Sequence, residues 1–310
     1  MDSEDLRVTD APASSTGESS SPYVPLDGSP WQLSMGLHRL DPRRWLEVDA
    51  RRAEDLRRKA RLLVDARHDV LATLPKSGAA AAELLSLVVD SLLRDTPGAV
   101  TIDGDVLTDQ STGFAVDTAA MHPLEAAARV VQEDLCVLER VEGPWRLTAA
   151  CVCFPSRWRL SDKIGETLSS IHGPVPGFES ELARTSATFF DRLATERPVW
   201  RLNWTLLDTP ELHLPSPSSR RASTIEPSEA GARLWFRVER QTLRRLASSG
   251  AIVFTIRTYV DRLDSIVASR PDAAAALRAT LASVSDEVAA YKGWTAVLGP
   301  LTQWLDERVA

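Results

Sequence analysis

Apolar residues recur along the chain with two different periods, and the alternation between those periods predicts the order of its elements. In the first third, leucines and valines recur at helical spacing, every three to four residues. A short run with Asp103-Gly104-Asp105 at its centre predicts a hairpin over residues 100–107, and Pro123 opens a later helix. The helices predicted in this part cover residues 46–74, 79–94 and 122–131.

From residue 133 onward, strict alternation of side chains takes over. Trp145, Leu147 and Ala149 fall on one face of a predicted strand, while Arg146 and Thr148 fall on the other. The strands predicted in this way cover residues 135–140, 145–154, 199–207, 233–239 and 251–260. Helical spacing returns between and after them, at residues 161–171, 179–196, 240–247 and from 261 to the end, where Pro271 opens one helix.

This order of elements favours an α+β fold, in which short helices pack on one face of an antiparallel sheet and further helices flank it at both ends. Residues 1–25 are rich in Ser, Thr, Pro and Asp, so we expect a disordered tail. Residues 26–310 are then predicted to form one folded unit, with a Pro- and Ser-rich loop over residues 208–230.

Composition narrows the classes of function. A formal charge of −7 argues against a general nucleic-acid binder, and no apolar run approaches the ~20 residues that span a bilayer. Cys136, Cys151 and Cys153 lie in predicted strands, as expected of reduced, buried thiols. We therefore expect a cytoplasmic protein that binds neither nucleic acid nor membrane. The sequence has no Gly-rich nucleotide loop, P-loop, CxxC pair or GxSxG motif.

A histidine, His172, follows the helix predicted over residues 161–171 and leaves two interpretations open. In the first, it caps the helix by bonding to the last carbonyl groups, which spacing alone favours. In the second, it is an axial haem ligand whose other ring nitrogen is oriented by a carbonyl group. Pro174 and Pro176 would then fix the backbone beside the ligand. A metal set of Cys151, Cys153 and His172 is less favoured, because alternating strand cysteines are commonly buried hydrophobes.

Several long motifs resemble one known family. They are EDLCVLE at 133–139, WRLTAACVCFPSRW at 145–158 and KIGETLSSIHGPVP at 163–176, followed by shorter matches at 201–204, 237–246, 254–259 and 291–293. Together they resemble the haem-dependent oxidative N-demethylase family, formerly a domain of unknown function. The resemblance implies a PAS-like haem-binding fold.

The activity that the resemblance implies is demethylation of a secondary amine such as dimethylamine with O₂, which yields formaldehyde. It also implies haem b and electrons from NADPH, delivered through a flavin and a [2Fe–2S] centre. This chain has no cysteine set for such a cluster and no flavin fingerprint, so partner proteins would have to supply the electrons. The alternative is a non-catalytic haem sensor of O₂, NO or redox state.

By the same resemblance, His172 is the expected proximal ligand to the haem iron. A haem also needs cations for its propionates. The candidates for holding the haem are Arg157, Lys163, Arg201 and Arg240, and the candidates for catalytic roles are Glu239, Arg257 and Tyr259.

Overall fold

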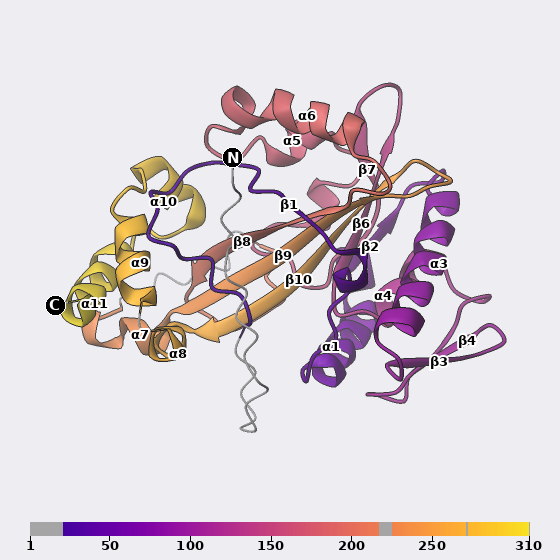
Figure 1. Ribbon diagram of the computed structural model, residues 1–310, viewed down its shortest axis with the longest axis horizontal. Helices are drawn as coiled ribbons and strands as arrows, with labels where there is room; N and C mark the ends of the chain where they lie inside the picture. Colours follow the sequence, from indigo (N-terminus) through magenta and orange to yellow (C-terminus); the bar gives the residue numbers. More distant parts are fainter. Residues whose placement is uncertain (1–20, 217–224, 271, 310) are drawn as a thin grey trace.

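A seven-stranded antiparallel sheet forms the centre of the computed structural model, which describes residues 21–216, 225–270 and 272–309 (Figure 1). The expected α+β class is confirmed. The strand order is β1-β8-β9-β10-β6-β7-β2. The strands are β1 (His38–Arg39), β2 (Leu71–Thr73), β6 (Asp134–Arg140), β7 (Trp145–Cys151), β8 (Val199–Leu207), β9 (Trp235–Arg245) and β10 (Ile252–Arg262).

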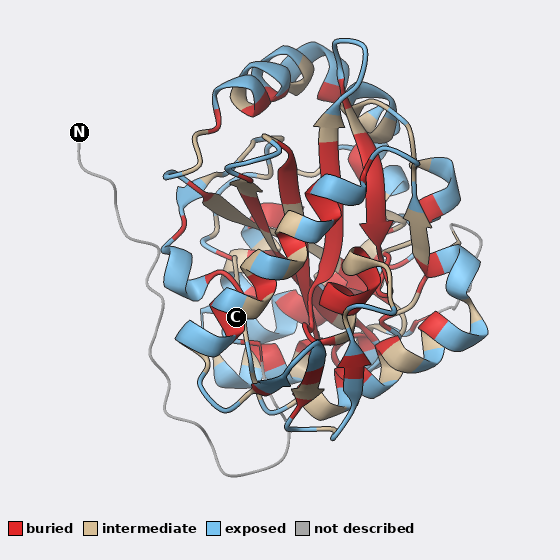
Figure 2. Ribbon diagram, turned by 90° about the vertical axis from the view of Figure 1, so that its right-hand side faces the viewer, coloured by how far each residue is buried: buried red, intermediate tan, exposed pale blue. Residues whose placement is uncertain are grey.

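The two longest strands, β9 and β10, pair along their whole length, from Arg245 opposite Ile252 to Trp235 opposite Arg262. The helix predicted over residues 240–247 is therefore wrong, because that segment continues β9. Its residues favour a helix locally, but β8 and β10 flank β9 and satisfy its backbone groups on both sides. Figure 2 shows that buried residues concentrate in these central strands.

Helices at the N-terminal end pack against one end of the sheet (Figure 1). The single helix predicted over residues 46–74 is wrong, since it breaks at Ala66 and ends in β2, which pairs with β7. The second predicted helix is present, and the third ends two residues early. These helices are α1 (Arg52–Asp65), α2 (Arg67–Val70), α3 (Gly78–Asp95) and α4 (Pro123–Arg129).

A small separate sheet lies beside these helices (Figure 1). The hairpin predicted around Asp103-Gly104-Asp105 is confirmed, and a third strand that the sequence pattern missed completes the sheet. Its strands are β3 (Val100–Asp103), β4 (Val106–Asp109) and β5 (Ala115–Asp117).

The helices between β7 and β8 are shorter than predicted. In place of one helix over residues 161–171 there is a 3₁₀ turn at Leu160–Asp162 and then α5 (Leu168–His172), which the Thr167 side chain caps by accepting from the Ser170 N–H. The helix predicted over residues 179–196 is a π turn, Phe178–Leu182, that continues as α6 (Ala183–Arg192). Both helices lie above the sheet in Figure 1.

The C-terminal helices pack with the N-terminal segment in a second core, together with Trp204, Trp294 and Trp304. Tyr23 is buried in this core, so the expected disorder is wrong for residues 21–25, while residues 1–20 lie outside the described part. Pro271 also lies outside it. The last part of the predicted loop forms a helical turn, Pro227–Glu229. The helices are α7 (Ala230–Arg233), α8 (Leu263–Ser269), α9 (Ala273–Leu281), α10 (Asp286–Lys292) and α11 (Leu298–Val309).

Across the described ranges, no helix combines the length and apolar character needed to cross a bilayer.

Candidate functional site

The register of β8, β9 and β10 divides the predicted site residues between two faces of the sheet. Asn203 pairs with Glu239, and Glu239 with Thr258. In the next row, Leu202 pairs with Arg240, and Arg240 with Arg257. Because directly paired residues share a face and successive residues alternate, Glu239 and Arg240 point to opposite sides.

We name the two sides by the helices that cover them. The α5 face carries Arg201, Asn203, Glu239 and Gln241 and continues into the apolar cluster that contains Leu168 and Ile171 of the α5 segment. The α1 face carries Arg240, Arg257 and Tyr259. Among the predicted residues, only Arg201 and Glu239 from these strands therefore face α5, the helix that ends at His172.

His172 presents one ring nitrogen away from its own helix. Its Nδ1 lies 2.8 Å from the carbonyl oxygen of Leu168. A carbonyl oxygen only accepts, so Nδ1 carries the proton, and in the neutral ring the lone pair is on Nε2. Within the described ranges no hydrogen-bond partner is found for Nε2. The histidine is thus bonded to its helix carbonyl and still has a nitrogen available to a ligand.

The segment after His172 holds the ring in place. The imidazole stacks on the Phe178 ring with the centroids 4.7 Å apart and the planes 18° from parallel. The Val175 N–H donates to the His172 carbonyl at 2.8 Å, and the Phe178 N–H donates to the Val175 carbonyl at 3.1 Å. Gly177 has a φ of +78° and lies against the Glu181 carboxylate, where a Cβ would come within 2.8 Å of Oε1. A tight turn therefore brings Phe178 back under the imidazole.

The electrostatic surroundings keep His172 neutral. Burial lowers its pKa, and the nearby cations Lys163 and Arg201 lower it further. Lys163 is itself fixed, since its Nζ donates to the Ile171 carbonyl at 2.9 Å and lies 5.2 Å from the centre of the Trp158 ring. The structure thus brings three predicted residues, His172, Lys163 and Arg201, into one neighbourhood.

The Arg201 guanidinium group has one donor that no described residue uses. Its Nη1 donates to the carbonyl groups of Met35 at 3.2 Å and Ser34 at 3.4 Å. Its Nε is buried and has no hydrogen-bond partner among the residues described. Burial lowers the pKa of Arg201, and Glu239 acts in the opposite direction. A buried donor without a partner on a cation is suited to an anionic group of a ligand.

Glu239 is fixed by three donors. Its Oε1 accepts from Arg237 Nε at 3.1 Å, and its Oε2 accepts from Gln241 Nε2 at 3.1 Å and Asn203 Nδ2 at 3.3 Å. Arg237 is fully buried and also donates to the Phe154 and Leu212 carbonyl groups. Sequence reasoning missed Arg237 and Gln241, although the strand predicted over residues 233–239 already placed Arg237 on the side of Glu239, and extending it through residue 245 would have placed Gln241 there too.

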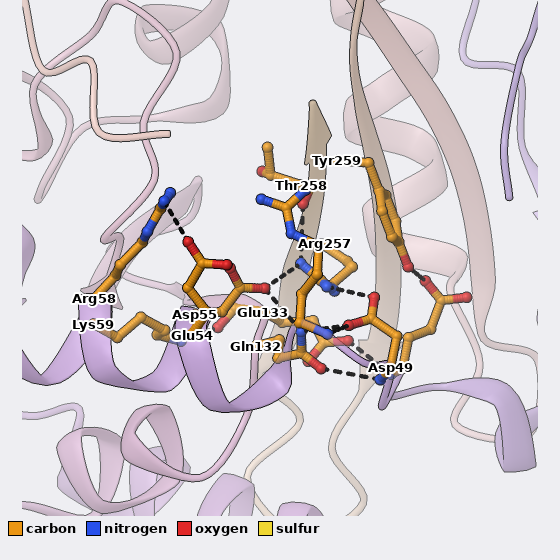
Figure 3. Close-up of polar contacts among 12 residues, drawn as sticks. Asp49, Glu54, Asp55, Arg58, Lys59, Gln132, Glu133, Arg257, Thr258 and Tyr259 are labelled. Carbon is orange, nitrogen blue, oxygen red and sulfur yellow. Dashed lines mark hydrogen bonds and ion pairs between the residues drawn. The ribbon is translucent and has the colours of Figure 1, made fainter. Parts of the chain in front are cut away.

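The predicted residues on the α1 face form a separate ionic network (Figure 3). Arg257 pairs with Asp49 at 2.7 Å and with Asp55 at 3.2 Å. Burial alone would lower the pKa of Arg257, but Tyr259 and these carboxylates raise it. The Tyr259 hydroxyl donates to Glu47 at 2.6 Å.

Arg240 belongs to the same network, since it pairs with Glu47 at 3.3 Å and donates to the Trp45 carbonyl at 3.1 Å. The network therefore attaches residues 44–55 to the sheet. Arg157 lies apart from it and pairs with Asp208 at 2.8 Å.

The thiols of Cys151 and Cys153 are reduced and buried, with their sulfur atoms 4.0 Å apart. The hydrogen bond between them and burial both raise the pKa of the Cys153 thiol. No cluster of three or more His, Cys, Asp or Glu side chains able to hold a metal ion occurs in the part of the chain that the structure describes.

Fold and site together define a mixed α+β protein in which a histidine directs one ring nitrogen away from its helix, close to two cationic side chains. Residues 36–301 match the model of a family described as haem-dependent oxidative N-demethylase, alpha subunit-like. The chain belongs to this family. The family's name implies haem, oxidoreductase chemistry and further subunits.

Proposed function

We propose that this protein binds haem b through Nε2 of His172 and oxidatively demethylates an alkyl amine, with release of formaldehyde. The observation that carries the proposal is the bond from His172 Nδ1 to the Leu168 carbonyl, which directs the Nε2 lone pair away from α5. Metal-binding histidines commonly have their second nitrogen oriented by a carbonyl group in this way. The lowered pKa keeps the lone pair free at neutral pH.

The residues around His172 fit a haem. Lys163 and Arg201 supply positive charge for the propionates, and Arg201 Nε has no partner among the residues described. Arg157 is a further candidate, because its Nη1 is also buried without a described partner. In the sheet, β6, the first strand after α4, lies beside β10, the last strand, and the connection from β7 to β8 contains α5 and α6. This arrangement supports a PAS-like fold. When bound, the haem supplies the iron chemistry that oxidises the amine with O₂.

Glu239 is the group that we assign to the amine. It lies on the α5 face, where three donors orient its carboxylate, and a carboxylate attracts an alkylammonium ion. Arg240, Arg257 and Tyr259 lie on the α1 face, so we assign them a supporting role, in which they hold the strands that present Arg201 and Glu239.

Electrons must come from outside the chain in this proposal, because its three cysteines are buried thiols and its sequence has no flavin or nicotinamide fingerprint. We propose a separate reductase that carries a flavin and a [2Fe–2S] centre and is fed by NADPH. A small amine and O₂ are the substrates.

The visible spectrum of the protein purified after reconstitution with haem tests the ligand. We expect a Soret band that is lost in His172→Ala and retained in His213→Ala. His213 is a matched control, since its Nδ1 also lies 2.8 Å from a carbonyl oxygen, that of Cys153. A protein that stays colourless would refute the proposal.

Formaldehyde release from secondary amines, driven by a surrogate reductase, tests the reaction. We expect release that depends on both haem and Glu239. Haem binding without formaldehyde from any amine would instead favour a sensor of O₂, NO or redox state.

A further inference from the structure

Two side-chain amides lie beside the carboxylate that we assign to the amine. Asn203 is directly opposite Glu239 on the neighbouring strand β8, and Gln241 follows Glu239 by two residues on β9, so all three share the α5 face. Both amides donate to the same atom, Glu239 Oε2, from Asn203 Nδ2 at 3.3 Å and from Gln241 Nε2 at 3.1 Å. One amide therefore holds the carboxylate from across the sheet and the other from along the strand.

Each of these amides also has an oxygen atom that no described residue uses. An amide that donates through its nitrogen keeps its oxygen as an acceptor with two lone pairs. Asn203 Oδ1 and Gln241 Oε1 have no hydrogen-bond partner in the ranges 21–216, 225–270 and 272–309, and neither atom is buried. The two oxygens are therefore acceptors that a ligand on the α5 face can reach.

Glu239 itself keeps room for one more donor. A carboxylate has about four lone-pair positions, and Arg237 Nε occupies one of them on Oε1 at 3.1 Å, in addition to the two amides on Oε2. The Glu239 side chain is 11% exposed, so an incoming N–H group can reach it. The remaining carboxylate position and the two amide oxygens together form a set of neighbouring acceptors for a cation.

We propose that Asn203 and Gln241 determine which amines the site accepts, because their oxygens accept hydrogen bonds from the N–H groups of the alkylammonium ion that Glu239 attracts. This inference rests on the proposed role of Glu239 as the anchor for the amine. A dialkylammonium ion has two N–H groups, a trialkylammonium ion has one and a tetraalkylammonium ion has none. All three carry the same charge, so the carboxylate attracts each of them. The amide oxygens add a charge-assisted hydrogen bond only where an N–H group is present.

A purely positioning role for the two amides makes a different prediction. If Asn203 and Gln241 only orient Glu239, their loss weakens the binding of every alkylammonium ion by the same factor. If their oxygens bind the ligand, their loss weakens the ions that have N–H groups and spares the ion that has none. The ratio of the affinities for different ions therefore separates the two roles, whatever the absolute affinity is.

Calorimetric titration of the full-length wild-type protein with dimethylammonium, trimethylammonium and tetramethylammonium chloride measures this ratio without any turnover and without a variant. We expect dimethylammonium to bind most tightly and tetramethylammonium least tightly. Each N–H group that is replaced by a methyl group should lower the affinity roughly tenfold, the effect of one hydrogen bond to a charged group.

Two variants of similar side-chain volume, Asn203→Leu and Gln241→Met, remove one amide each. Each should lower the affinity for dimethylammonium roughly tenfold and change the affinity for tetramethylammonium less than about threefold, so that the preference for dimethylammonium declines. Thr205→Val is the matched control, because Thr205 lies on the same face of β8, one row further along, opposite Arg237. This variant should follow the wild type for all three ions. Circular dichroism confirms that each variant is folded.

The outcomes separate this inference from the proposed function. A wild-type protein that binds all three ions equally overturns the role of the amides alone, and so does an unchanged ratio in folded Asn203→Leu and Gln241→Met. Binding that persists undiminished in Glu239→Gln overturns the role of Glu239 and the inference with it, as does an absence of binding of every ion. Haem ligation by His172 is decided independently by the Soret band.

Discussion

The imidazole of His172 and the phenyl ring of Phe178 are stacked, with centroids 4.7 Å apart, although a tight turn of prolines and glycines separates them in the chain. Phe178 is buried and His172 is half-buried. One side of the imidazole is therefore supported by a ring that cannot easily move, and the direction of Nε2 is fixed before any ligand arrives.

Removing this support should weaken haem binding without unfolding the protein. Aromatic pairs contribute ~0.5–1.5 kcal/mol beyond their buried area, so Phe178→Leu should lower haem affinity roughly threefold to tenfold. Titration of the haem-free protein with haem, followed at the Soret band, measures the change. Phe189→Leu is the control, because Phe189 contacts Phe190 on α6 and not His172. Equal losses in both variants would contradict a role for the stack.

Acid should release the haem through His172. Burial lowers the pKa of this histidine below its usual value of ~6.5, so the free protein keeps the ring neutral at pH 7. Protonation places a hydrogen on Nε2, which then has no lone pair for iron. Haem affinity should be constant above pH 6.5 and fall at lower pH, by about tenfold for each unit below the folded pKa. Soret titrations checked by circular dichroism measure this, and a decline that starts above pH 7 would refute the assignment.

Breaking the ionic network of Arg257 should lower the stability of the protein without changing the Soret band of bound haem. Arg257 and Asp55 have side chains only 1% and 0% exposed. Arg257→Met leaves buried carboxylates without their cation, which typically costs about 3–5 kcal/mol. Arg262→Met, on the same strand, removes an exposed pair with Asp264 and should cost less than about 1 kcal/mol. Urea unfolding compares the two variants, and a lost Soret band in folded Arg257→Met would place Arg257 in the haem site instead.

The sequence pattern predicted the parts of the fold that depend on local alternation. It identified the strands β6, β7, β8 and β10 and placed Arg201 with Asn203 on one side of β8. It failed at residues 240–247, where local composition favours a helix and pairing with two neighbouring strands prevails. The very short strands β1 and β2 were missed because two or three residues carry no period.

The grouping of the predicted site residues follows from the same cause. Ending the strand at residue 239 hid the fact that Glu239 and Arg240 alternate, so candidates from both faces were grouped together. His172 was singled out by its motif, and its bond to Leu168 matches both interpretations that spacing had left open, because the capped nitrogen and the available nitrogen are different atoms. Lys292 could not be placed against Trp204 by any local signal, since a contact between α10 and β8 brings them together.

A pair of glycines tests how the C-terminal helices are attached to the rest of the protein. A Cβ on Gly231 of α7 would lie 2.2 Å from Cζ2 of Trp304, a buried ring on α11, so Gly231→Ala forces α7 and α11 apart. Overpacking of this kind costs roughly 1–3 kcal/mol or more. A Cβ on Gly299 of α11 meets nothing within 4 Å, so Gly299→Ala should stabilise the helix by up to about 1 kcal/mol. Urea midpoints should therefore move in opposite directions, and a Gly231→Ala midpoint at or above that of the wild type would show that the packing of Trp304 on α7 is not tight.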